Sequence, residues 1–159
     1  MRHFMLLTLT LMLCVPALAD DEADIQALID EYCRLESNLA EQGKLMTHDR
    51  IMINAGRRQT DQATNMKVQL AGQKLNQELD PGAELIVTVV DPIIKVYGQA
   101  AVASFYRYWD LIPSAEYVKA HPGENTTGPP PNIVTVVLVK QSDGWKISHM
   151  HMSRLHPRN

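Results

Sequence analysis

Cysteine is scarce in this sequence, since the 159 residues contain only Cys14 and Cys33. Aromatic side chains make up only 6% of the chain, and 15 basic residues face 18 acidic ones. The lack of a basic stripe argues against a nucleic-acid-binding protein. His149 and His151 are one residue apart, but no further histidine or cysteine has the spacing of a zinc site. We therefore expect no metal and no cofactor.

The chain has one long apolar run, and it lies at the N-terminus in residues 4–15. About a dozen residues are too few to span a bilayer. Residues 17–19 read Ala-Leu-Ala, the small-residue pattern of a signal peptidase site. Residues 1–19 are predicted to be a secretory signal peptide that is cleaved before Asp20. A lipid anchor on Cys14 is disfavoured because the residue before it, Leu13, is large.

The mature protein would therefore be residues 20–159, a single domain that is periplasmic or secreted and free of the membrane. Its one cysteine, Cys33, cannot form an internal disulfide, so stability must come from a packed core. Cys33 lies at a helical core spacing, which favours a buried, unreactive thiol.

Two helices are predicted in the first half of the mature chain. Over residues 24–42, apolar side chains recur at steps of three and four, which is typical of a helix with one buried face. Thr60 is the expected cap of a second helix that ends before residues 80–82, Asp-Pro-Gly. Its predicted buried face consists of Val68, Ala71, Leu75 and Leu79.

The second half of the chain has the pattern of an antiparallel sheet. A short strand at residues 50–53 precedes it, and longer strands are predicted at 84–97, 100–109, 133–140 and 145–155. Tight turns at residues 97–100 and 141–144 indicate two hairpins. Asp91 and Pro92 predict a bend or bulge within the first long strand. The last run spans about eleven residues, which is long for a strand in a chain of this size, so we expect it to be a central strand.

Residues 110–132 contain five prolines and few apolar side chains. They are predicted to form a loop insertion with one helical turn near residues 116–120. Such a loop would be a lid, an interface arm or a floppy insertion.

Two stretches carry a resemblance to a known family: VDPIIKVYGQAAVASFYR at 90–107 and VTVVLVKQSDGWKISHMHMS at 134–153. Together they resemble the nuclear transport factor 2-like superfamily, and the SnoaL-like branch in particular. The final hairpin is similar to that of the calcium/calmodulin-dependent kinase association domain. The resemblance implies an α+β fold in which a curved antiparallel sheet wraps around the N-terminal helices as a cone-shaped α+β barrel. It also implies an internal pocket and a homodimer formed through the sheet.

Arg107 is the first candidate binding residue. Side chains alternate along a strand, so Phe105, Arg107 and Trp109 share one face with Ala101 and Ala103. By the resemblance, Arg107 falls where the association domain has an arginine that points into the cavity. A guanidinium beside two aromatic rings could bind a carboxylate. The alternative is a structural ion pair with Glu31 or Glu36 from the first helix.

By the same resemblance, Met150 and Met152 face the cavity. Met152 stands where the association domain has an arginine, so the pocket is expected to be more apolar. Tyr32, on the apolar stripe of the first helix, could donate to a ligand oxygen or simply belong to the core. His149 and His151 would then lie on the outer surface as interface residues, although a pocket acid/base role stays open.

These features predict an exported protein that binds a small, mostly apolar molecule that can carry a negative charge. Two alternatives stay open. One is an isomerase, dehydratase or cyclase that uses Tyr32, Arg107 and a histidine. The other is an assembly module whose cavity is filled with side chains.

Overall fold

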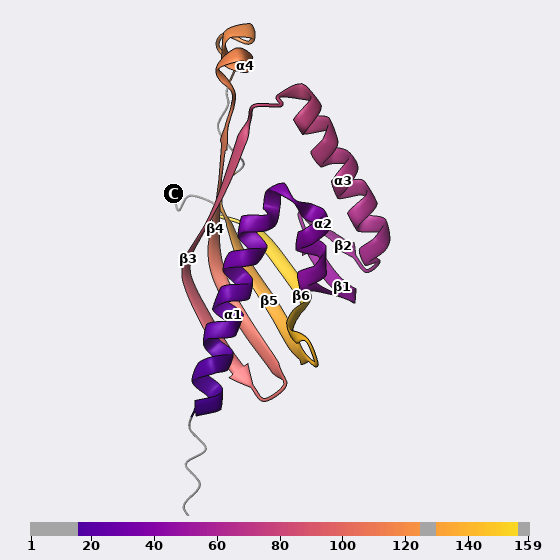
Figure 1. Ribbon diagram of the computed structural model, residues 1–159, viewed down its shortest axis with the longest axis vertical. Helices are drawn as coiled ribbons and strands as arrows, with labels where there is room; N and C mark the ends of the chain where they lie inside the picture. The colour runs from indigo at the N-terminus through magenta and orange to yellow at the C-terminus, as the bar shows by residue number, and fades with distance from the viewer. Residues whose placement is uncertain (1–15, 125–129, 156–159) are drawn as a thin grey trace, which may run out of the picture.

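A single six-stranded sheet organises the structure, a computed structural model that describes residues 16–124 and 130–155. The strand order is β2-β1-β6-β5-β4-β3. The sheet is curved and unclosed, and α1 lies across one face of it (Figure 1). This arrangement confirms the predicted α+β class. The strands are β1 (Met46–Asn54), β2 (Arg57–Gln59), β3 (Glu84–Tyr97), β4 (Ala100–Ile112), β5 (Asn132–Gln141) and β6 (Gly144–Arg154).

The last strand, β6, lies between β1 and β5, which confirms its predicted central place. Both predicted hairpins are present, since β3 pairs with β4 and β5 with β6. The β3–β4 register shifts between Val90 and Ile93, where Asp91 has a positive φ of 51°. The predicted bulge at Asp91 and Pro92 is therefore confirmed.

The region of the first strand departs from the prediction in three ways. The strand runs over nine residues, Met46–Asn54, instead of the four predicted at 50–53. A tight turn then leads into β2, which was not predicted. β1 also pairs with β6 in parallel, so the sheet has one parallel pair among otherwise antiparallel ones. A three-residue strand such as β2 is too short to show an alternating pattern.

Among the described residues, four α-helices accompany the sheet: α1 (Pro16–Arg34), α2 (Leu39–Gln42), α3 (Gln62–Leu79) and α4 (Ala115–Ala120). The prediction of one continuous helix over 24–42 was wrong. A 3-10 turn, Leu35–Ser37, follows Arg34, and the side chain of Asn38 then accepts a hydrogen bond from the Glu41 backbone N–H. Asparagine competes for backbone hydrogen bonds in this way, so it favours helix starts over helix interiors. None of the described helices is long and apolar enough to cross a membrane.

The core lies between α1 and the covered face of the sheet. The helix contributes a buried stripe of Ile25, Ile29, Tyr32 and Cys33. Cys33 is free and only 3% exposed, as predicted. The strands contribute Met46, Met52, Ala101, Ala103, Phe105, Val134, Val136, Leu138, Trp145, Ile147, Met150 and Met152. These side chains define the inner face of the sheet.

The start of α1 is hydrogen-bonded to the C-terminal hairpin, β5–β6. The carboxylate of Asp21 accepts hydrogen bonds from Lys140 Nζ and, at 3.1 Å, from Trp145 Nε1. Lys140 belongs to β5 and Trp145 to β6, so this contact fixes the helix against their hairpin. The Lys140 hydrogen bond is the main cause that lowers the pKa of Asp21 below its usual 3.8.

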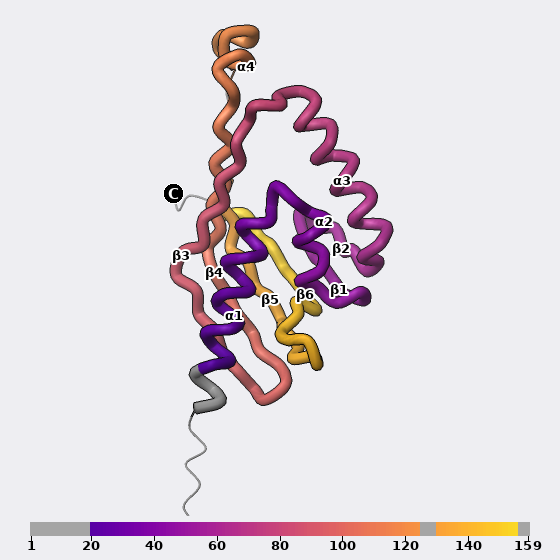
Figure 2. The backbone as a smooth tube through the Cα atoms, in the orientation of Figure 1, coloured from indigo at the N-terminus to yellow at the C-terminus, as the bar shows by residue number. Residues whose placement is uncertain are grey.

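The second helix differs from its prediction. Its cap is Asp61, whose side chain accepts from the Thr64 backbone N–H, and not Thr60. None of the described residues of α3 is buried. Val68, Ala71, Leu75 and Leu79, predicted to form its buried face, are all exposed. Figure 2 shows α3 standing apart from the main body of the sheet. It contacts β1 and α2, and Gln73 in its middle donates to the Ser37 carbonyl. The predicted buried face was therefore wrong.

The predicted loop at 110–132 is shorter than expected. β4 continues to Ile112, and α4 accounts for the predicted helical turn. Ser114 caps α4 by accepting from the Tyr117 backbone N–H at 3.1 Å. The β3–β4 ribbon extends beyond the body of the sheet with α4 at its tip (Figure 1).

Candidate functional site

Arg107 lies on the inner face of the sheet and is only 2% exposed. Its Nη2 donates to Met152 Sδ at 3.0 Å, and its guanidinium carbon lies 4.4 Å from the centre of the Trp109 ring. Its Nη1 is 3.7 Å from Glu36 Oε2. The Nε and Nη1 atoms have no hydrogen-bond partner among the described residues. Arg107 is thus paired, as the structural alternative predicted, and still has donors available.

Glu36 is the carboxylate of this cluster, and it comes from the 3-10 turn that breaks the first helix. It accepts a hydrogen bond from Gln42 Nε2 at 2.6 Å, and the same amide donates to the Tyr32 carbonyl. Burial raises the pKa of Glu36, and Arg107 and Gln42 only partly oppose that effect. The other predicted partner, Glu31, pairs with Arg34 on the surface instead.

A second arginine, Arg50, reaches the interior from β1 and is 1% exposed. Its Nε donates to Gln62 Oε1 at the start of α3. Its Nη1 and Nη2 have no partner in the part of the chain that the structure describes. Burial lowers the pKa of Arg50. The sequence prediction did not include Arg50 in the site.

Tyr32 lies within the electrostatic reach of both arginines. Its hydroxyl donates to Met150 Sδ at 3.5 Å. Burial is the main cause that raises the pKa of Tyr32; the charge of Glu36 adds to it, while Arg107 and Arg50 oppose it. The neighbouring thiol responds similarly, since burial raises the pKa of Cys33 to about 12 and the Arg107 charge opposes this. Tyr32 and Cys33 are therefore neutral donors at physiological pH.

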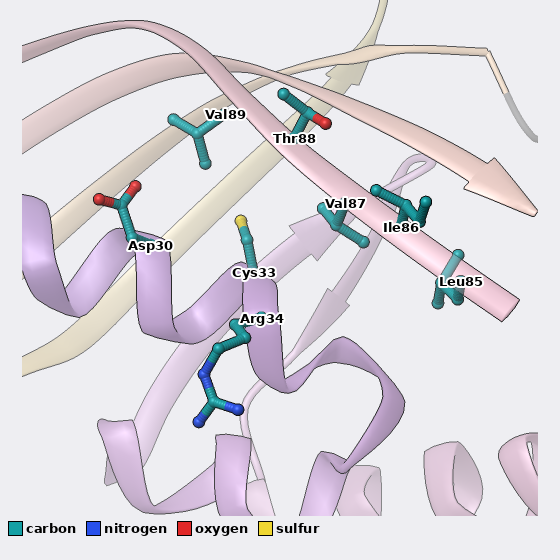
Figure 3. Close-up of a pocket in the computed structure, with 8 residues that line it drawn as sticks. All are labelled: Asp30, Cys33, Arg34, Leu85, Ile86, Val87, Thr88 and Val89. Atoms are coloured by element: carbon teal, nitrogen blue, oxygen red, sulfur yellow. The ribbon is translucent and has the colours of Figure 1, made fainter.

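A groove of about 390 Å³ runs between α1 and β3. Cys33 extends from the helix toward β3, and Asp30 and Arg34 lie on the same helix (Figure 3). The groove is lined by Asp30, Cys33, Arg34, Leu85, Ile86, Val87, Thr88 and Val89.

The strand register brings this groove next to the buried cluster. Val87 pairs with Trp109 and Val89 with Arg107. The Trp109 ring is half-buried, and its Nε1 has no hydrogen-bond partner in the described residues. The groove is therefore lined by apolar strand residues together with the charged Asp30 and Arg34, and the strand that carries Trp109 and Arg107 lies directly beside β3.

The predicted site residues fall into two groups. Tyr32, Phe105, Arg107, Met150 and Met152 are buried on the inner side, and Trp109 packs against Arg107. Both methionine sulfurs act as acceptors of the cluster.

His149 and His151 belong to the other group. They alternate with the buried Met150 and Met152, so they lie on the outer face of the sheet. Their neighbours on β1 are Ile51 and Ile53. The histidines are thus separated from Tyr32 and Arg107 by the sheet itself.

Arg50 and Gln42 are two interior polar residues that sequence reasoning missed. One signal for Arg50 was available. It is two residues from Met52, so a strand places both on one face, and Met52 is an apolar residue expected to face the core. No comparable signal existed for Gln42, because its burial depends on the helix break at Asn38.

Comparison with known proteins agrees on the fold. No model of a known protein family matches the chain, and no curated protein sequence matches it. Solved structures do match. An NTF2-like protein with a cystatin-like fold from Novosphingobium aromaticivorans superposes with a TM-score of 0.68 at 13% identity, over 89% of this chain and 86% of that one.

Two further structures give the same result. An NTF2-like superfamily protein from Salmonella enterica has a TM-score of 0.66 at 18% identity, over 90% of this chain and 96% of its own. ActVI-ORFA from Streptomyces coelicolor has a TM-score of 0.69 at 12% identity, over 89% of this chain and 99% of its own. The chain therefore has the nuclear transport factor 2-like fold, as its resemblance predicted. The likeness of the last hairpin to the kinase association domain stays a prediction.

Proposed function

We propose that this protein binds a small, mostly apolar molecule in the groove between α1 and β3. The observation that carries the proposal is the position of the groove, whose wall residues Val87 and Val89 pair with Trp109 and Arg107. Binding sites for small molecules are commonly apolar clefts with a few polar groups that orient the ligand. A volume of about 390 Å³ falls within the usual range of such sites.

Native mass spectrometry of the protein purified from its own compartment tests this proposal. We expect a noncovalent small molecule that is released on mild activation, together with the mass of the assembly. Two results together would contradict the proposal: a protein that carries no such molecule, and a melting temperature that no member of a panel of apolar acids and alcohols raises.

An enzyme of the isomerase, dehydratase or cyclase type is the second candidate. Glu36 favours it, because a buried carboxylate with a raised pKa has the properties of a general base. It lies close to Arg107, and its charge acts on Tyr32. The histidines do not support this candidate, since they lie on the outer face. Deuterium incorporation into a ketone probe such as 2-tetralone, lost in Glu36→Gln, would identify this activity.

The third candidate is an assembly module that binds no ligand because side chains fill its cavity. The groove argues against it, whereas the outer face of the sheet suits an assembly role. The large apolar side chains exposed there include Ile51, Ile86, Val90, Ile93, Val102, Tyr106, Tyr108 and Ile133. None of the described helices covers them (Figure 1). We propose that the protein forms a homodimer through this face.

We also propose that the protein is exported, on the basis of the signal-peptide pattern in residues 1–19. Residues 1–15 of that segment lie outside the described structure. The exported protein should begin at Asp20 in N-terminal sequencing. A chain that still begins at Met1, or a lipid on Cys14, would contradict this.

A further inference from the structure

One edge of the sheet is free along β3. This strand is last in the strand order, and β4 pairs with it continuously from Glu84 to Val90 on one side only. In an antiparallel pair, every second residue turns its backbone N–H and C=O toward the partner strand, and the residues between turn theirs the other way. Among the described residues, no backbone group is hydrogen-bonded to that second edge. Residues 84–90 therefore present a row of unpaired backbone donors and acceptors.

The lining of the groove shows that it runs along this free edge. Five consecutive residues of β3 line it: Leu85, Ile86, Val87, Thr88 and Val89. Successive side chains of a strand point to opposite faces of the sheet, so a hollow above one face would touch only every second residue. A hollow that touches all five follows the edge of the strand. Figure 3 shows β3 beside α1, with Val89 and Thr88 on opposite sides of the strand.

The same stretch of β3 lacks the features that protect an edge strand from pairing. Natural sheets protect long edges with bulges, prolines and lysines. The second half of β3 has all three, in the bulge at Asp91, in Pro92 and in Lys95. Residues 84–90 have none of them and are rich in β-branched side chains. The unprotected part of the edge is therefore the part that borders the groove.

The helix side of the groove contributes one uncompensated charge. Arg34 donates to Glu31 through two hydrogen bonds of 2.6 and 2.5 Å, and it points away from β3 (Figure 3). Asp30 points toward β3. Its only hydrogen-bond partner among the described residues is the neutral amide of Gln26, at 2.9 Å. A chain that enters the groove therefore meets apolar side chains along β3 and a carboxylate on α1.

We propose that the groove binds an extended peptide segment of another protein, which joins the sheet as an added strand beside residues 84–90. Hydrogen bonds between the two backbones supply affinity in this mode of binding, and alternate side chains supply specificity. The inward-pointing side chains of the peptide pack beside Val87 and Val89, and a basic side chain pairs with Asp30. The inference goes beyond the proposed function, because it gives the groove a polypeptide partner and does not depend on the small molecule.

An N-methyl scan of a probe peptide tests the backbone pairing. The probes are the acetylated and amidated heptapeptide Thr-Val-Thr-Val-Thr-Lys-Thr and its reversed sequence, so that both directions of the added strand are tested. Each backbone nitrogen is methylated in turn, and binding to the purified protein is measured by calorimetry. We expect at least one of the two peptides to bind. Methylation should weaken it about 10-fold at every second position, the usual effect of losing one hydrogen bond, and by less than about threefold between.

Hydrogen exchange on the protein locates the peptide. Amide protons at a free edge exchange readily, whereas amide protons in a hydrogen bond are protected. Binding of the peptide should protect the amides of alternate residues within 84–90. The control is β2, Arg57–Gln59, which forms the opposite edge of the sheet, and its exchange rates should not change.

Asp30→Asn tests the charged contact. The lysine peptide should bind more tightly than the same peptide with glutamate in place of lysine, and Asp30→Asn should reduce that preference about threefold, as expected for a partly exposed ion pair. Asp24→Asn is the matched control, because Asp24 is exposed on the same helix but does not line the groove. It should leave the preference unchanged. A preference that Asp30→Asn does not alter would overturn the contact with Asp30.

Four results would overturn the added strand. The first is an N-methyl scan without alternation, and the second is protection of β2 in place of β3. The third is an edge of β3 that is already protected in the free protein at micromolar concentration, because a second copy of the chain would then occupy it. The fourth is the failure of both peptides to bind. A small molecule retained in native mass spectrometry together with that failure would support the proposed function and reject the peptide.

Discussion

At the scale of single residues, Arg107 is held by three unlike neighbours: a thioether, an indole ring and a carboxylate 3.7 Å away. None of them is a close ionic partner. The structural and the binding interpretations of Arg107 are therefore compatible, because the pair with Glu36 leaves donors available. A variant that lacks the guanidinium distinguishes the structural role from the binding role, because stability and ligand binding can be measured separately on it.

Arg107→Leu should lower the free energy of unfolding, because Glu36 is left without its cation. A tight buried pair broken in this way loses about 3–5 kcal/mol. We expect about 1–3 kcal/mol here, because the pair is long, Gln42 still donates to Glu36, and its raised pKa makes protonation easier. Urea denaturation measures the loss. The double variant Arg107→Leu/Glu36→Gln should recover part of it, and a double variant no more stable than the single one would show that Arg107 acts otherwise.

The sequence could predict which strand residues share a face, because alternation is a local property. Alternation put Phe105 on one face with Arg107, and Met150 on one face with Met152, whereas the family resemblance turned Arg107 and both methionines toward the cavity. Their burial agrees. The sequence could not predict how Arg107 and Glu36 approach one another, since that depends on the break after Arg34. Arg50 was missed because its strand was expected to begin at that residue, where a face is least certain.

At the scale of elements, the long strands form where their sequence patterns predicted them, whereas the helices agree with their predictions only in part. The apolar stripe of α1 is buried from Ile25 to Cys33. An equally regular stripe on α3 is exposed, with Val68 at 68% and Leu79 at 65%. A periodic pattern shows which side of a helix is apolar, but it does not show whether another element covers that side.

Leu75→Ala on α3 should change the free energy of unfolding by no more than about 0.5 kcal/mol, as is usual for exposed positions. Ile29→Ala is the matched control on α1, and its buried side chain should cost about 2–5 kcal/mol. Chemical denaturation of both variants gives the comparison. A similar loss in the two would mean that the apolar face of α3 is covered in solution.

Asp21→Asn should lower the melting temperature, because the amide oxygen is a weaker partner for Lys140 and Trp145 than a carboxylate. The pH dependence follows from the lowered pKa of Asp21. A carboxyl with a lowered pKa stabilises the fold above its usual pKa of 3.8, and that contribution is lost as the pH falls below this value. The difference in melting temperature should therefore be full at pH 6 and shrink toward pH 3. A constant difference would contradict the role of the ionised carboxylate.

At the scale of the whole molecule, the two faces of the sheet differ in character and in proposed role. The inner face holds the polar cluster under α1, and the outer face carries exposed apolar side chains around Tyr106 and Val102. His149 and His151 lie among them. A dimer through the outer face would leave α1 and the inward-facing groove residues Leu85, Val87 and Val89 on the opposite side, so we expect assembly and binding to be compatible.

Tyr106→Glu should convert the predicted dimer into a monomer, because it places a charge within an apolar interface. Leu75→Glu is the control, since Leu75 is exposed on α3 and not on the sheet. Sedimentation at micromolar concentration should show a dimer for the wild type and the control. A monomeric wild type, or a dimer that survives Tyr106→Glu, would contradict an interface on this face.

The methionines offer the most direct test that a ligand enters the inner side of the sheet. Met150 and Met152 contact Tyr32 and Arg107 through their sulfur atoms, whereas Met66 belongs to α3. With 13C-methyl-labelled methionine, titration of 2-naphthoate followed by NMR should shift the Met150 and Met152 methyl signals. The Met66 signal should stay in place. If calorimetry detects binding while Met150 and Met152 do not move, the ligand lies elsewhere and the central claim is wrong.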